Sequence, residues 1–354
     1  MSGPILDCFK HIRINFLKLK KEKKKGMELM NFELKVLLLS FGVSVILALI
    51  IVPILRRFKI GQIERTDGPQ SHLKKQGTPT MGGIIMALTL VAVAGFLFYN
   101  RSRVEIDIVK RMIPLVFITL GFGLVGFVDD FKKLILKNTE GLKPMLKMFG
   151  LLIISVIYTF YLIKYLNLGT ETYIPILKEY ITLPIWLYIP FAIFVLLGTT
   201  NAINLTDGID GLSTSVTTII LTCLVAISII LGVEEITLIG IILIGACLGF
   251  LIFNLYPAKV FMGDTGSLLL GGAISGIALY LKMPLILVII ALIPIIETIS
   301  VMMQVAYYKK TGKRIFKMAP IHHHFELCGW KEGKVVSIFS IITLILCIIG
   351  INVI

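Results

Sequence analysis

The stretch LVFITLGFGLVGFV, residues 115–128, contains only apolar side chains, glycine and one threonine, and it ends at two aspartates, Asp129 and Asp130. Apolar stretches recur from Leu34 to the C-terminus. Roughly 17–25 such residues are needed to cross the ~30 Å hydrocarbon core of a bilayer. The chain of 354 residues is 56% hydrophobic and only 16% charged, and its mean hydropathy is +0.93. A soluble globule would lack polar surface, so the sequence predicts an all-α integral membrane protein.

About ten membrane-spanning helices are expected from these stretches. The predicted ranges are 34–55, 80–99, 111–128, 145–166, 184–200, 212–231, 236–254, 265–281, 283–307 and 335–353. The connection 167–183 contains TYIPI and EYITL, in which β-branched and aromatic residues recur. This composition is typical of short strands and predicts a small extracytoplasmic hairpin.

The distribution of positive charge predicts the orientation of the helices, because Lys and Arg concentrate in cytoplasmic connections. Most Lys and Arg between the spans lie in the odd-numbered connections, which are therefore expected to be cytoplasmic, with both termini outside. The lysine-rich arm 1–33, which precedes the predicted membrane domain 34–354, conflicts with this topology. Two interpretations are open: residues 1–26 are an upstream extension or cloning remnant, or they form a basic amphipathic helix at the membrane surface.

The net charge of +14 could indicate a nucleic-acid partner. Because the excess Lys and Arg lie in short segments between apolar stretches, membrane topology and anionic ligands explain it better, and no nucleic acid is expected. The five cysteines are scattered without a CxxC pair, at Cys8, Cys223, Cys247, Cys328 and Cys347. Structural disulfides and a thiolate metal site are therefore not expected.

Acidic residues gather at the expected cytoplasmic ends of the helices. Asp129 and Asp130 are followed by several lysines, and adjacent carboxylates at a bilayer boundary require a cation or a specific use. The segment NAINLTDGIDGLS, residues 201–213, contains four polar residues at three-residue spacing, which would share one face of a helical turn: Asn201, Asn204, Asp207 and Asp210. Helix capping and a simple polar turn are the structural alternatives.

The segment NLYPAKVFMGDTGSLLLGG, residues 254–272, places Asp264 directly before an apolar helix. The side chain could cap that helix, or it could hold Mg²⁺, which binds one or two carboxylates and leaves positions for water and phosphate oxygens. No GK[ST] follows the glycine-rich turn, so a P-loop is excluded.

Three consecutive histidines, His322, His323 and His324, follow a lysine-rich segment. Consecutive imidazoles cannot easily converge on one metal, and they lack the i,i+4 spacing of a zinc helix. They are better suited to donate hydrogen bonds to a phosphate-rich ligand. Glu297 and Gln304 are seven residues apart and are expected on one helix face that extends toward this segment.

Five segments in fixed order resemble the family of bacterial phospho-N-acetylmuramoyl-pentapeptide transferases, over roughly residues 34–354. They are TPTMGG (78–83), GFVDDFKK (126–133), NAINLTDGIDG (201–211), FMGDTGS (261–267) and APIHHHFE (319–326). The superfamily of polyprenyl-phosphate N-acetylhexosamine-1-phosphate transferases shares the aspartate motifs. TPTMGG and APIHHHFE resemble the muramoyl-pentapeptide branch, and an N-acetylglucosamine-1-phosphate transferase is the alternative.

The resemblance implies a Mg²⁺-dependent reaction between UDP-N-acetylmuramoyl-pentapeptide and undecaprenyl phosphate, giving lipid I and UMP in peptidoglycan biosynthesis. It places the enzyme in the cytoplasmic membrane of a bacterium, with the active site facing the cytoplasm. It further implies a homodimer and a ninth span broken near its middle, to which Pro294 could contribute.

The resemblance also implies roles for individual residues. Asp129, Asp130, Asp264 and His322 are the expected catalytic residues, and Asp264 is the expected metal ligand. Lys75, Asn254 and Phe261 are expected at the uridine, on which Phe261 could stack. The complete set expected to bind substrate is Lys75, Thr80, Lys133, Lys147, Asn204, Asp207, Asp210, Asn254, Phe261, Gln304, His323 and His324.

Two other function classes compete with a transferase, a secondary transporter and a non-catalytic lipid-binding scaffold. A transporter places ionisable residues near the bilayer midplane, whereas here, apart from Glu297, they lie at the ends of the spans. A scaffold would not require a constellation of Asp, Asn and His. Both alternatives are therefore less favoured.

Overall fold

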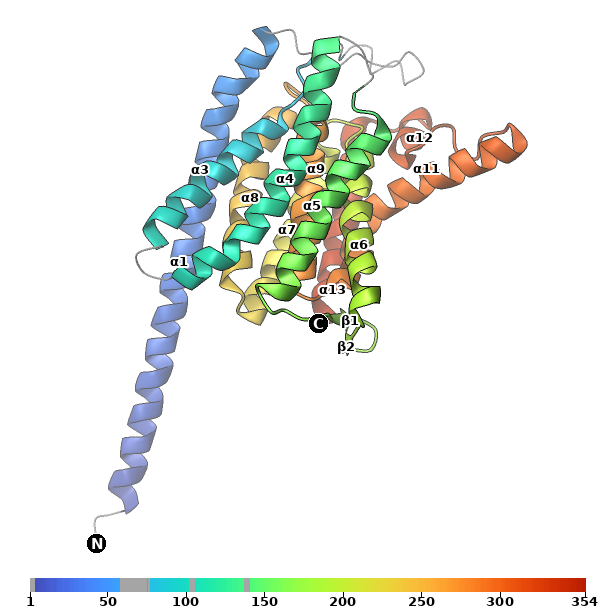
Figure 1. Ribbon diagram of the computed structural model, residues 1–354. Coiled ribbons are helices and arrows are strands. Elements are labelled where there is room, and N and C mark those ends of the chain that lie inside the picture. Colours follow the sequence, from blue (N-terminus) through green and yellow to red (C-terminus); the bar gives the residue numbers. More distant parts are fainter. Residues whose placement is uncertain (1–3, 58–74, 76, 102–105, 137–140) are drawn as a thin grey trace.

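The computed structural model describes residues 4–57, 75, 77–101, 106–136 and 141–354. The chain is a bundle of helices with one small sheet (Figure 1). The helices are α1 (Pro4–Arg57), α3 (Gly83–Arg101), α4 (Ile106–Leu136), α5 (Pro144–Lys164), α6 (Ile185–Thr206), α7 (Leu212–Leu231), α8 (Glu234–Asn254), α9 (Gly263–Tyr280), the 3-10 helix η1 (Pro284–Ile286), α10 (Leu287–Ile290), α11 (Leu292–Thr311), α12 (Ile321–Leu327) and α13 (Glu332–Asn352).

Among the described residues, seven helices are long and apolar enough to cross a membrane, or eight if a bent pair counts as one span. The prediction of an all-α integral membrane protein is therefore confirmed, but the count of ten is not. The apolar part of α3, Gly83–Tyr99, is shorter than a full span. Helix α9 begins with the polar segment GDTGS, which lowers its hydropathy.

Helix α9 forms the centre of the bundle, where it packs against α3, α4 and α6. All its residues from Thr265 to Tyr280 are buried. Glycine makes the close packing possible: a Cβ atom at Gly126 of α4 would lie 2.1 Å from the carbonyl oxygen of Asp264, and one at Gly83 of α3 would lie 2.1 Å from the backbone nitrogen of Gly266. These contacts fix the first turn of α9 beside the C-terminal part of α4.

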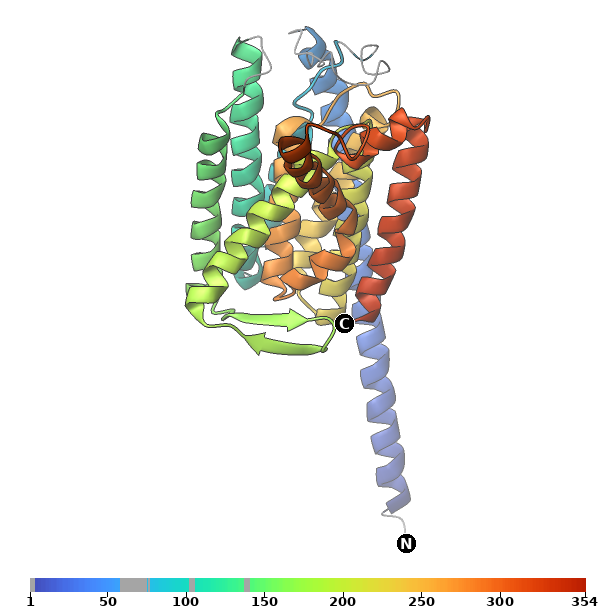
Figure 2. The same cartoon turned by 90° about the vertical axis from the view of Figure 1, so that its right-hand side faces the viewer.

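The predicted hairpin is confirmed as strands β1 (Glu171–Ile174) and β2 (Glu179–Thr182), which pair antiparallel with Tyr173 opposite Tyr180. Figure 2 shows it at the end of the bundle where the C-terminus lies. The Tyr173 hydroxyl donates a hydrogen bond to the Val353 carbonyl at 2.8 Å, which joins the hairpin to the C-terminal end of the chain. The N-terminal part of α1 projects from the same end, so both termini lie on one side, as predicted (Figure 1).

The basic arm is continuous with the first span, because α1 begins at Pro4 and ends at Arg57 without a break. Side chains before Met30 lie outside the part of the structure that is described. The division into an arm, 1–33, and a membrane domain, 34–354, therefore stays a prediction.

The expected break in the ninth span is present. The segments Pro284–Ile290 and Leu292–Thr311 meet at an angle of 81°, and Ala291 between them has the non-helical angles φ −107° and ψ 25°. Pro294 lies in the first turn of α11, where its missing N–H removes no helical hydrogen bond. Helix α11 therefore projects sideways from the bundle (Figure 1).

Candidate active site

Three carboxylates meet where the C-terminal part of α4 lies against the start of α9. Asp129, Asp130 and Asp264 each offer an oxygen, and these atoms lie within 4.8 Å of one another. Asp130 accepts hydrogen bonds from the Thr265 backbone N–H at 2.9 Å and hydroxyl at 2.6 Å. It thereby caps α9 from a neighbouring helix, which leaves Asp129 and Asp264 to face the lysines.

Both predicted lysines contact this cluster. Lys133 Nζ lies 2.7 Å from Asp129 and 2.7 Å from Asp264, and Lys147 Nζ lies 3.1 Å from Asp264. Lys133 follows Asp129 by four residues in α4, so both side chains share one helix face. Because three carboxylates outnumber the two ammonium groups, negative charge remains that a further cation could neutralise.

The end of α6 supplies the next polar groups, as the Asn and Asp spacing predicted. Asn204 donates to Asp264 Oδ1 at 2.7 Å and to the Ser267 hydroxyl at 2.8 Å. Asp207 is the residue at which α6 ends. Burial and the nearby carboxylates of Asp264 and Asp130 raise the pKa of Asp207 to about 8. Asp207 therefore belongs to the same electrostatic cluster.

A second cluster joins four distant segments. Lys75 Nζ lies 2.7 Å from Asp210 and 2.5 Å from Glu332 in the first turn of α13, while Asp210 also accepts from the Ala258 N–H at 2.9 Å. Although burial lowers the pKa of Lys75, the hydrogen bonds that its ammonium donates to Asp210 and Glu332 hold that pKa above its usual value. Sequence reasoning missed Glu332, because a single Glu 257 residues away gives no signal.

Thr80 and Phe261 lie on two segments that pair through their backbones. The Phe261 N–H donates to the Pro79 carbonyl at 2.8 Å, and the Phe261 carbonyl accepts from the Gly82 N–H at 2.9 Å. A Cβ atom at Gly263 would lie 2.9 Å from the Thr80 hydroxyl oxygen, which places Thr80 beside the start of α9. This pairing brings the TPTMGG and FMGDTGS segments together.

Asn254 is enclosed by protein. Its side chain is 2% exposed, donates to the Val260 carbonyl at 3.0 Å and accepts from the Thr214 hydroxyl at 2.6 Å. These bonds close the loop that leads to Phe261. The structure thus gives Asn254 a role in shaping this loop, and direct contact with uridine stays a prediction.

The three histidines of α12 have different surroundings. His322 is fully buried, with Nδ1 3.1 Å from Glu297 Oε2. His323 Nδ1 lies 2.8 Å from Glu326 Oε2, and His324 Nδ1 accepts from the Lys317 N–H at 3.1 Å. The three imidazoles thus have different polar partners.

Gln304 and Glu297 both extend from α11 toward the histidine segment, as their seven-residue spacing predicted. The Gln304 side-chain oxygen accepts from the Ile315 and Phe316 N–H groups at 3.0 Å, and its amide donates to the Phe316 carbonyl at 3.2 Å. The contacts described for Gln304 therefore hold the loop before α12 in place.

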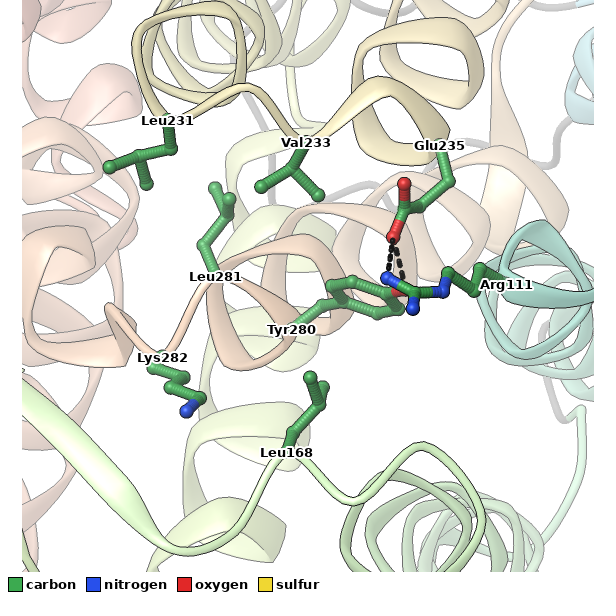
Figure 3. Close-up of a pocket in the computed structure, with 8 residues that line it drawn as sticks. All are labelled: Arg111, Leu168, Leu231, Val233, Glu235, Tyr280, Leu281 and Lys282. Atoms are coloured by element: carbon green, nitrogen blue, oxygen red, sulfur yellow. Dashed lines mark hydrogen bonds and ion pairs between the residues drawn. The ribbon is translucent and has the colours of Figure 1, made fainter. Parts of the chain in front are cut away.

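A cavity of about 230 Å³ lies at the other end of α9 (Figure 3). Its polar lining includes Glu235, which accepts a hydrogen bond from the Tyr280 hydroxyl at 2.7 Å and lies 3.7 Å from Arg111. Tyr280 and Asp264 are at opposite ends of α9, roughly 24 Å apart along a helix that rises ~1.5 Å per residue. The cavity is therefore separate from the carboxylate cluster.

Comparison with known proteins identifies the family. The model for Glycosyl transferase family 4 matches residues 112–282. The phospho-N-acetylmuramoyl-pentapeptide-transferase of Acetivibrio thermocellus is 48% identical over 317 residues, which cover 89% of this chain and 93% of the relative. That of Clostridium perfringens (strain 13) is 51% identical over 314 residues, which cover 89% of this chain and 96% of the relative. The chain belongs to the phospho-N-acetylmuramoyl-pentapeptide-transferase family.

As a member of this family the chain is a transferase and a bacterial membrane protein. The carboxylate cluster has the donor set that a hard divalent cation prefers, since carboxylate oxygens suit Mg²⁺ and the ion completes its shell with water or phosphate oxygens. Asp129, Asp130 and Asp264 are the residues that could hold such an ion. Asp130 has the least freedom to do so because it caps α9.

Proposed function

We propose that this transferase moves phospho-N-acetylmuramoyl-pentapeptide from its UDP derivative to undecaprenyl phosphate, releasing UMP and forming lipid I for peptidoglycan synthesis. The observation that carries the proposal is the contact of Asp129, Lys133 and Asp264 at the end of an apolar helix. A water-soluble nucleotide and a membrane-bound phosphate can meet at such a boundary. The lysine-rich connections support a cytoplasmic orientation for this end.

The proposed reaction is a displacement at phosphorus. An oxygen of the lipid phosphate attacks the sugar-linked phosphorus of the UDP derivative, and the bond to the bridging oxygen breaks so that UMP leaves. Asp129 would accept a proton from the lipid phosphate or position it, while Lys133 and Lys147 would neutralise phosphate charge. Mg²⁺ bound by Asp264, with Asp129 and Asp130 beside it, would supply additional neutralisation of the pyrophosphate.

The remaining predicted residues divide between two regions in this proposal. Lys75, Asn254 and Phe261 would bind the uridine side, and Thr80, Asn204, Asp207 and Asp210 would line the substrate site between them and Asp264. His322, which is buried against Gly208, would face the pyrophosphate or the amino-sugar side together with His323, His324 and Gln304. A homodimer in the bacterial cytoplasmic membrane completes the proposal.

The proposal is tested by measuring UMP release from purified protein in detergent. UDP-N-acetylmuramoyl-pentapeptide and undecaprenyl phosphate with Mg²⁺ are expected to release UMP, and a chelator is expected to stop the release until Mg²⁺ is restored. Replacing the donor by UDP-N-acetylglucosamine separates the two branches of the superfamily. Faster release from that donor would contradict the muramoyl assignment and favour an N-acetylglucosamine-1-phosphate transferase.

A further inference from the structure

Glu297 is a buried carboxylate inside the bent ninth span. It lies in α11, six residues beyond the break at Ala291, and its side chain is fully buried. A carboxylate inside a membrane protein is costly unless a partner compensates it. The contacts described for its carboxylate are both with one residue: His322 Nδ1 lies 3.1 Å from Oε2, and the His322 backbone N–H donates to Oε2 at 3.4 Å.

The other side of the His322 ring lies against Gly208. A Cβ atom at Gly208 would lie 2.1 Å from His322 Nε2, so only glycine fits beneath the ring. Gly208 directly follows Asp207, which accepts a hydrogen bond from the backbone of Gly263, the residue before Asp264. Contacts therefore run from the bend of the ninth span, through His322 and the Asp207 segment, to the start of α9.

We propose that Glu297 is a positioning residue, which fixes the His322 ring against Gly208 and so holds the Asp207 segment at the active site. A carboxylate that lies beside one imidazole nitrogen and accepts from the backbone N–H of the same residue favours one position of the ring. Among the described residues, Glu297 Oε1 and both ring nitrogens of His322 have no hydrogen-bond partner within the protein, although Nδ1 lies 3.1 Å from Glu297 Oε2. Glu297 and His322 therefore each retain an atom that could form a further hydrogen bond. This inference rests on the proposed function.

The test compares Glu297→Gln with His322→Ala and with the double variant in the UMP-release assay. Thr298→Val is the matched control, because Thr298 adjoins Glu297 and its hydroxyl bonds only to the Pro294 carbonyl among the contacts described. Glu297→Gln is expected to lower kcat at least about tenfold while the KM for the UDP substrate changes less than about twofold. Thr298→Val is expected to retain wild-type kcat. The double variant should be no slower than His322→Ala, because each substitution alone already disrupts the Glu297–His322 pair.

Turnover of Glu297→Gln within twofold of wild type, or losses that multiply in the double variant, would overturn the inference. If Glu297→Gln does not fold, Glu297→Asp replaces it: this variant keeps the charge but withdraws the carboxylate by one methylene. A folded Glu297→Asp with wild-type kcat would also overturn the inference. Absence of UMP release by the wild type would overturn the proposed function and this inference together, whereas an active wild type with an unaffected Glu297→Gln overturns only the inference.

Discussion

Asp129 and Asp130 are neighbours in the chain but have different surroundings. Both are buried, but Asp130 caps α9 through Thr265 and lies 4.0 Å from Lys133, whereas Asp129 lies 2.7 Å from Lys133 and accepts from the Leu142 N–H at 2.6 Å. The sequence was sufficient to single out this pair, because two adjacent carboxylates at a bilayer boundary are costly. It was not sufficient to divide their roles, since that depends on which helix lies opposite each side chain.

Asp129→Asn separates proton transfer or positioning from nucleotide binding. The amide keeps the shape of the side chain and loses its charge, so kcat is expected to fall by about 10²-fold or more, in the range typical of general acid–base groups. Affinity for UDP-N-acetylmuramoyl-pentapeptide, titrated on the purified variant, is expected to stay nearly unchanged. A large loss of affinity with normal turnover at saturation would instead move Asp129 into the nucleotide pocket.

Phe261→Ala is expected to change substrate affinity rather than turnover, the opposite of Asp129→Asn. If Phe261 stacks on uracil, its removal weakens binding of the UDP substrate by roughly 0.5–1.5 kcal/mol beyond the effect of lost area. Turnover at saturating substrate is expected to change little. The same titration measures this, and unchanged affinity in the folded variant would remove Phe261 from the proposed uridine pocket.

Helix α9 shows how element packing builds the site. Its start lies beside α4 because Gly126 leaves room for the Asp264 backbone, and Asp130 then reaches Thr265. The sequence predicted a helix here and identified Asp264 in its first turn. The contact with Gly126 could not be predicted, because the sequence does not indicate which neighbouring segment approaches a given glycine.

Gly126→Ala tests this packing. A Cβ atom 2.1 Å from a backbone oxygen cannot be accommodated without moving α4 or α9, so turnover and the melting temperature are both expected to fall. Gly95→Ala in α3 is the matched control, since a Cβ atom there has nothing within 4 Å. Equal activity and stability of the two variants would show that the contact does not position Asp264.

For the molecule as a whole, the order of apolar stretches was enough to predict a helical membrane protein, its hairpin and a common side for both termini. The count of ten spans is not confirmed among the described residues, because α3 and α9 are shorter or more polar than a full span. The contact of Lys75 with Glu332 could not be predicted from the sequence, since it joins segments that only the assembled bundle brings together.

Deleting residues 1–26 tests the role of the basic arm. The active-site contacts described here involve none of these residues, so the shortened protein is expected to keep wild-type UMP release and the same orientation. Protease protection in oriented vesicles measures the orientation. Loss of turnover in a correctly inserted protein would show that the arm is part of the working enzyme.

The carboxylate cluster around Asp264 is the proposed catalytic centre of phospho-sugar transfer. UMP release by Asp264→Ala tests this role, at saturating concentrations of both substrates and Mg²⁺, with folding checked by gel filtration and melting temperature. Turnover is expected to fall below roughly a hundredth of wild type, because the neighbouring carboxylates cannot replace the ligand that faces Lys133 and Lys147. A folded variant that retains more than about a tenth of the wild-type rate, a barrier change below ~1.4 kcal/mol, would contradict the catalytic role of Asp264.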